Sequence, residues 1–287
     1  MNNKDLIIGG CSGYDWSQLQ YWVNSIKKSG FEGDVVLVAT DITKETIDKL
    51  TSRGVILDLY GSQTPDGSFV SGGGLPPHVA RFFYIWNYLN NNLGKYRNVI
   101  TTDVKDVIFQ SDPGEYVHNI GATLITSSEG MRYSTEPWGK KNFYDTFGPF
   151  FYEKYKNNLI YNVGVNAGSE SRMRDLMLMI FQMSLNRPIP IVDQAVYNFL
   201  MYQPTLSAFK TTNKDQWAIQ LGTTIHAIDS GAGDLGMSIQ NDQSNRIIYQ
   251  MNYLDVQPKI LEDGTVVNPP FDTPFAVVHQ YDRVHGL

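Results

Sequence analysis

The sequence is poor in cysteine and has no long apolar runs. One cysteine, Cys11, occurs among 287 residues, which excludes an internal disulfide and a cysteine-rich zinc site. No run of about 18 apolar residues occurs, and the start MNNKDLIIGG lacks the apolar region of a signal peptide. We therefore expect a soluble, cytoplasmic protein without an integral membrane segment.

Clusters of positive charge are also missing. The formal net charge is −6, and no block of Lys and Arg resembles a nucleic-acid stripe or a polybasic membrane anchor. We therefore expect no nucleic-acid partner. Aromatic residues, by contrast, make up 13% of the chain, and Tyr and Trp rings suit stacking on sugars or nucleobases, although they also fill ordinary cores.

Several signature motifs are missing as well. The chain contains no G-x-x-x-x-G-K-[ST] phosphate loop, no H-E-x-x-H and no G-x-S-x-G, which excludes a P-loop NTPase. A G-x-G-x-x-G match, GAGDLG at 231–236, comes late and is followed by MSIQNDQSNR, which has no helical period. The dinucleotide fingerprint works only between a strand and a helix, so this match is interpreted as a chance match in a loop.

Apolar runs and helical spacing alternate in the first half of the chain. The predicted strands cover 5–10, 34–40 and 54–60, and the predicted helices cover 17–30, 43–52 and 78–93. Such β-α-β alternation predicts a parallel sheet with helices on its faces. The segment 61–77, rich in Gly and Pro, predicts a long loop.

The second half is less regular. It predicts a strand at 121–128, an aromatic-rich loop at 129–152, helices at 171–185 and 192–203, and an apolar strand that begins at 275 and ends in polar residues. No repeat or low-complexity linker interrupts the chain. We therefore expect one α/β domain over 1–287, with a nucleotide-sugar-binding half at 1–110 and a variable, acceptor-binding half at 111–287.

The segment RNVITTDVKDVIFQSDP, at 97–113, ends an apolar strand in Asp103 and Asp106. An unpaired carboxylate near a core is costly, so something should meet the charge. Residues three apart on a strand point to opposite faces, so the two aspartates can share a ligand only if a turn intervenes. Two interpretations stay open: an exposed turn residue with a side-chain cap, or a hard cation that also binds a nucleotide diphosphate.

At these residues the chain resembles a known family. TTDVKDVIF, after a helix that contains HVARFF, resembles the metal-binding region of GT-A glycosyltransferases, which hold a divalent cation on a nucleotide-sugar with an Asp-x-Asp motif. The order of the later segments YNVGVNAGS, VDQAVYN and VVHQYDR is similar to that in family-8-like transferases. The D-x-x-D spacing departs from the family pattern. The resemblance covers most of the chain and implies a GT-A, Rossmann-like fold with a mixed, mostly parallel sheet flanked by helices.

The resemblance also implies roles for particular residues. The metal ligands would be Asp106, His279 and Asp103, the last on the metal or the ribose, and Mn²⁺ accepts such a mixed shell more readily than Mg²⁺. The groups that contact the nucleotide-sugar would be Gly10, Cys11, Tyr14, Arg81, Asn162 and Asn166. Asp193 and Gln194 would lie beneath the donor sugar.

Four of these residues also have ordinary structural interpretations. Arg81 could be a surface charge on a helix, and His279 a core histidine with its hydrogen bonds satisfied. Asp193 could cap a helix, and Tyr14 could belong to the core.

The implied reaction is transfer of a hexosyl or pentosyl group from a UDP-sugar to a hydroxyl of a glycan acceptor. An inverting enzyme needs a carboxylate base, for which Asp193 is the first candidate and Glu136 the second, whereas a retaining enzyme would use Asp193 or Gln194 differently. The segments 61–77 and 129–152 would form a lid and the acceptor-binding surface.

Two other functions remain as alternatives. One is a nucleotidyl- or phosphoryl-transferring enzyme, although GGCSGYD after the first strand lacks the expected Lys. The other is a non-catalytic nucleotide- or sugar-binding protein. The compact form is similar to bacterial transferases and to chlorovirus-type transferases, xylosyltransferases among them, which would act in the host cytoplasm.

Overall fold

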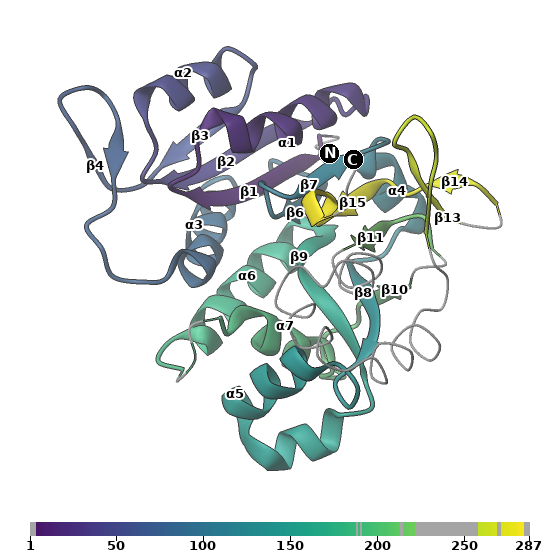
Figure 1. The fold of residues 1–287 in the computed structure, drawn as a ribbon. Coiled ribbons are helices and arrows are strands. Elements are labelled where there is room, and N and C mark those ends of the chain that lie inside the picture. Colours follow the sequence, from purple (N-terminus) through teal and green to yellow (C-terminus); the bar gives the residue numbers. More distant parts are fainter. Residues whose placement is uncertain are drawn as a thin grey trace.

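A mixed, mostly parallel sheet forms the centre of the molecule (Figure 1). The computed structural model describes residues 4–187, 189, 191–212, 215–221, 258–268 and 271–283. Within these ranges seven strands form this sheet, in the order β10-β8-β9-β6-β1-β2-β3. They are β1 (Leu6–Ser12), β2 (Asp34–Thr40), β3 (Ile56–Leu59), β6 (Asn98–Thr102), β8 (Leu124–Arg132), β9 (Leu159–Ser169) and β10 (Phe209–Thr211). Strand β9 is antiparallel to both neighbours and the other pairs are parallel, as in a Rossmann-like fold.

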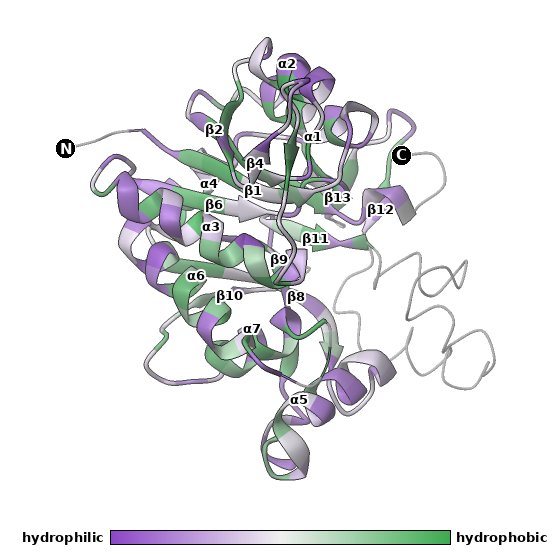
Figure 2. Cartoon of the chain, turned by 90° about the vertical axis from the view of Figure 1, so that its left-hand side faces the viewer, coloured by the Kyte–Doolittle hydropathy of each residue, from purple (hydrophilic) through white to green (hydrophobic). Residues whose placement is uncertain are grey.

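Helices cover both faces of the sheet. They are α1 (Trp16–Lys28), α2 (Lys44–Thr51), α3 (Pro77–Asn91), α4 (Pro113–Ile120), α5 (Pro137–Tyr155), α6 (Glu170–Ser184) and α7 (Asp193–Met201). Successive side chains of β1 point to opposite faces of the sheet. Leu6 and Ile8 pack with α3, α6 and α7, whereas Ile7 packs with α1, α2 and α4. Figure 2 shows helices with hydrophilic and hydrophobic stretches, whereas β2 is mostly hydrophobic because both its faces are covered.

A second, smaller sheet lies on the α1 side of the molecule. Its strands are β7 (Val107–Phe109), β11 (Ala218–Gln220) and β15 (Val277–His279). The middle strand, β15, is parallel to β11 and antiparallel to β7 (Figure 1). This pairing brings a strand from late in the sequence beside the segment that follows β6, and so beside the two aspartates.

The elements predicted for the first half of the chain are confirmed, with boundaries shifted by a few residues. Helix α1 begins after Asp15, which forms a capping box with Gln18. Gly30, with a φ of 84°, follows its end. The predicted loop 61–77 contains a short hairpin of β4 (Ser62–Gln63) and β5 (Phe69–Val70). A further small sheet consists of β12 (Lys259–Ile260), β13 (Val266–Asn268) and β14 (Thr273–Pro274), and a 3₁₀ turn covers Tyr281–Arg283.

The predicted aromatic-rich loop at 129–152 is wrong. Strand β8 extends into it, and helix α5 occupies most of the remainder. Glu136 caps the helix and Pro137 takes its first position, while Gly148, with φ 78° and ψ 174°, introduces a kink before Pro149. Aromatic packing around Phe143 stabilises the helix across that kink.

Two further predictions from the sequence concern the GAGDLG match and membrane-spanning helices. The GAGDLG segment lies outside the described residues. In the part of the chain that the structure describes, no helix combines the length and the apolar character needed to cross a membrane.

Candidate functional site

The chain forms a turn at the two aspartates. The two side chains can share a ligand only if such a turn is present. Strand β6 ends at Thr102 and β7 begins at Val107. The backbone N–H of Asp103 donates to the Gly164 carbonyl at 2.7 Å, and the Asp106 carbonyl accepts from the Gln280 N–H at 2.6 Å. Both aspartates line one cavity of about 430 Å³.

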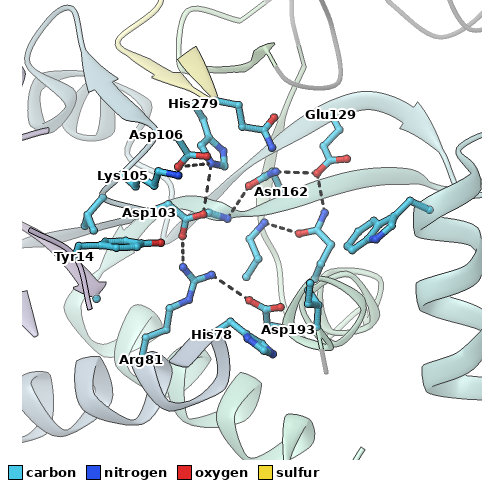
Figure 3. A pocket seen from close by; sticks show the side chains of 18 residues that line it. Tyr14, His78, Arg81, Asp103, Lys105, Asp106, Glu129, Asn162, Asp193 and His279 are labelled. Atoms are coloured by element: carbon cyan, nitrogen blue, oxygen red, sulfur yellow. Dashed lines mark hydrogen bonds and ion pairs between the residues drawn. The ribbon is translucent and has the colours of Figure 1, made fainter. Parts of the chain in front are cut away.

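His279 completes a group of three possible metal ligands. Its Nε2 atom lies 3.5 Å from Asp103 Oδ2 and 3.5 Å from Asp106 Oδ1 (Figure 3). One ligand atom from each residue lies within 4.8 Å of the others. The pairing of His279 with Val107 in the β15–β7 register delivers the imidazole to this place.

A buried amide sets the orientation of the imidazole. The Nδ1 atom of His279 lies 2.6 Å from Gln220 Oε1, to which it donates, and Gln220 Nε2 donates to Ser127 Oγ at 2.7 Å. Gln220 is the neighbour of His279 in the β11–β15 register. The Nε2 atom therefore faces the aspartates, as a metal-binding histidine with a fixed second nitrogen would.

Electrostatics hold the three side chains together. Burial lowers the pKa of His279, but the carboxylates of Asp106 and Asp103 outweigh it and raise the pKa to about 9. Burial raises the pKa of the Asp103 carboxyl, yet Arg81 and His279 hold that pKa well below its usual range. A cation bound by these three side chains would have to displace the proton that this raised pKa favours on the imidazole.

Gly164 has no side chain, and this leaves room for the side chains of His279 and Asp103 to approach each other. A Cβ atom at this position would lie 2.6 Å from His279 Cε1 and 2.7 Å from Asp103 Oδ2, so any side chain would force the site apart. Two carboxylates and one imidazole form a mixed oxygen and nitrogen donor set. The residues present therefore fit a divalent cation.

Arg81 bridges the aspartates of two different elements. Its Nη1 atom bonds to Asp103, and its Nη2 atom lies 3.1 Å from Asp193 Oδ2 (Figure 3). The Arg81 side chain is 17% exposed, so the interpretation as a surface charge is wrong. In α7 the N-cap residue is Val192 and Asp193 is the first helical residue, so Asp193 does not occupy the cap position. Burial raises the pKa of Asp193, although Arg81 opposes this.

A second polar cluster lies across the cavity from Tyr14 in the view of Figure 3. The Oε1 atom of Glu129 accepts hydrogen bonds from Asn162 Nδ2 and from Gln194 Nε2, each at 2.8 Å. The Oε1 atom of Gln194 accepts from the Val163 N–H at 2.9 Å. The sequence prediction missed Glu129 because it fell in the segment expected to be a loop.

Two predicted residues are not brought to the cavity. Glu136 is buried and accepts from the backbone N–H groups of Trp138, at 2.8 Å, and Gly139, so it caps α5. Asn166 is fully buried in β9 and donates to the Val163 carbonyl at 2.6 Å. Neither lines the cavity.

A second cavity, of about 380 Å³, adjoins the first. Both are lined by Gly10, Tyr14, His78 and Arg81. The residues that line only the second cavity include Cys11, Ser12, Thr40, Asp41, Ser71 and Tyr84. Of the predicted nucleotide contacts near β1, Gly10 and Tyr14 thus face both cavities and Cys11 the second. No pattern in the sequence singled out His78.

Comparisons with protein families and with curated proteins assign no function to this site. No protein-family model matches this chain, and no curated protein sequence matches it.

Proposed function

We propose that this protein is a metal-dependent glycosyltransferase of the GT-A type, with a UDP-sugar as donor and a glycan hydroxyl as acceptor. The observation that carries the proposal is the convergence of Asp103, Asp106 and His279 beside Arg81. They meet where strand β6 ends, and open α/β sheets bind ligands at the carboxyl ends of their strands. A hard cation held by few protein atoms retains positions for the oxygens of a diphosphate.

The two adjoining cavities suit the parts of such a donor. The second cavity would take the nucleoside, with the half-buried Tyr14 ring available for stacking on the base. Arg81 lies where the cavities join, and its planar fork suits a diphosphate. The first cavity would then hold the sugar. Gly10 supports this arrangement because a Cβ atom there would lie 2.8 Å from Arg81 Cβ.

The residues of the chain contribute to the reaction mainly through fixed charge and position. When bound, the cation would neutralise the charge that develops on the departing diphosphate. Arg81 adds a guanidinium charge at the same place. Asp103 and Asp193 hold this guanidinium before any ligand arrives, so little reorganisation is needed.

Two carboxylates in the first cavity are candidates for the base that accepts the proton of the acceptor hydroxyl. Asp193 is one, and burial raises its pKa, which moves it in the direction useful for a base. Glu129 is the other, and its Oε1 atom is held by two amide groups. We prefer Glu129 to Glu136 as the second candidate because Glu136 caps α5 and does not line the cavity.

The test is UDP release from a panel of UDP-sugars in the presence of Mn²⁺. The wild-type protein should release UDP, and Asp106→Asn should lower the rate by about 100-fold or more, because a ligand of the charge-neutralising cation is weakened. Asp48→Asn is the matched control, since Asp48 is 61% exposed in an ion pair on α2.

Two outcomes would contradict the proposal. A wild-type protein that binds no nucleoside diphosphate in Mn²⁺ would remove its basis. Binding of UDP-sugars without UDP release, with any glycan acceptor or with water, would favour a non-catalytic binding protein instead.

A further inference from the structure

Gln280 faces the same cavity as His279, although the two residues are consecutive. Consecutive side chains of a strand point to opposite faces. Here strand β15 ends at His279, and Gln280 adopts a left-handed backbone conformation with a φ of 62°. Both side chains therefore line the first cavity.

The surrounding structure holds this uncommon conformation in place. A left-handed φ is infrequent for residues other than glycine and asparagine, and it persists where neighbouring contacts fix it. The Gln280 N–H donates to the Asp106 carbonyl at 2.6 Å, which ties the turn to the candidate metal site. The amide is thus positioned by the backbone that also places Asp106 and His279.

The Gln280 side chain has an unsatisfied acceptor. Gln280 is 8% exposed, and across the described residues no hydrogen-bond partner reaches its buried Oε1 atom. Leaving a buried acceptor unpaired costs free energy, so such atoms are infrequent in folded proteins. Because Gln280 lines the first cavity, rotation of its terminal amide would bring this buried oxygen to a hydrogen-bond donor of a ligand bound there.

The chemistry of the proposed donor substrate indicates which of its groups can donate a hydrogen bond to the Gln280 Oε1 atom. The diphosphate carries acceptor oxygens, so it cannot satisfy an amide oxygen. A sugar hydroxyl can, because its O–H donates. A sugar attached to a diphosphate that Arg81 and the candidate metal ligands hold would lie in the first cavity, which Gln280 also lines.

We propose that Gln280 is a specificity-determining residue that accepts a hydrogen bond from a hydroxyl of the donor sugar. This inference rests on the proposed function, since it assumes a nucleotide-sugar in the first cavity. Gln280 distinguishes a UDP-sugar from UDP itself, whereas Arg81 and the candidate metal ligands meet groups that both molecules share.

The test compares UDP with UDP-glucose, UDP-galactose and UDP-xylose, each titrated calorimetrically in Mn²⁺ against the wild type, Gln280→Met and Gln280→Gly. Met keeps the length of the side chain without the amide, and Gly removes the side chain while tolerating the left-handed φ. Both variants should bind the preferred UDP-sugar about tenfold more weakly, the effect of one lost hydrogen bond, with the affinity for UDP unchanged.

Thermal unfolding of the ligand-free variants separates this role from a structural one. Gln280→Met removes an unpaired buried acceptor, so its melting temperature should stay the same or rise. A lower melting temperature with equal weakening of UDP and UDP-sugars would overturn the proposal and assign Gln280 to the fold or to the cation.

The other possible results of the titrations also test the proposed role of Gln280. If both variants bind every UDP-sugar as tightly as the wild type does, the role of Gln280 is overturned but the proposed function is not. The same holds if the wild type binds UDP but none of the three UDP-sugars. A wild type that binds no UDP in Mn²⁺ overturns the proposed function as well.

Discussion

At the scale of single residues, the candidate metal site depends on the absence of a side chain at position 164. Gly164→Ala should weaken Mn²⁺ binding by about tenfold or more, because the new methyl group must displace His279 or Asp103. Gly72→Ala is the matched control, since a Cβ there meets no atom within 4 Å. Titration of both variants with Mn²⁺ gives the comparison. Equal affinities of the two variants would show that the three side chains do not hold the ion.

The amide that orients the imidazole gives a second prediction at this scale. Gln220→Leu leaves His279 Nδ1 without its acceptor, so Mn²⁺ affinity should fall by about 10- to 100-fold. Ser127→Ala removes the hydroxyl to which Gln220 Nε2 donates, leaves the bond to His279 in place and should have a smaller effect. The measurement is again an Mn²⁺ titration, with circular dichroism to confirm folding. If the serine variant loses as much affinity as the glutamine variant, the orienting role is wrong.

The sequence indicated the aspartates at the end of the apolar strand better than the residues that tertiary contacts bring to the site. Asp103 and Asp106 could be selected because carboxylates at the end of an apolar strand require a partner. Gln220, Gln280 and Glu129 could not, because nothing in their own segments sets them apart. Their roles arise from strand pairing and from a backbone turn, and both depend on contacts between distant parts of the sequence.

At the scale of elements, the start of helix α5 makes stability depend on pH. Burial, with a smaller contribution from Glu129, raises the pKa of Glu136 from 4.5 to about 8. The folded state therefore holds this proton more tightly than the unfolded state. The resulting stabilisation is complete below pH 4.5 and is lost as the pH rises to about 8, by up to about 1.4 kcal/mol per pH unit.

Urea unfolding at pH 5 and pH 8 measures this loss. In Glu136→Gln the group no longer titrates, so the fall in unfolding free energy between the two values should be smaller than in the wild type. The exposed Glu153, changed to Gln, is the control and should leave the wild-type difference in place. An identical pH difference in all three proteins would contradict the assignment.

Helix α5 also shows why the second half of the fold was harder to predict than the first. The early strands and helices alternate with regular hydrophobic periods, and each period has its own start and stop residues. In α5, Gly148 and Pro149 interrupt the period and are typical of a loop. The helix nevertheless forms because Phe143 and Tyr155 pack in a shared aromatic cluster, a tertiary effect that local sequence does not reveal.

At the scale of the whole molecule, the proposed ligands should stabilise the folded state together. With free ligand at about 100 times its dissociation constant, binding adds about 2.7 kcal/mol, which corresponds to a rise of several degrees in melting temperature. Mn²⁺ with UDP should produce this shift, and EDTA should abolish it. Asp106→Asn should reduce it, whereas a shift of full size in that variant would argue against a metal-bridged nucleotide.

The pairing of β15 with β7 has a consequence for the order of folding. Asp103 and Asp106 follow β6 directly in the sequence, but His279 arrives only when β15 has inserted between β7 and β11. Contacts between distant parts of a chain form slowly, because a long loop must be closed first. The capacity to bind a cation at this site should therefore be acquired late during refolding, after most of the central sheet has formed.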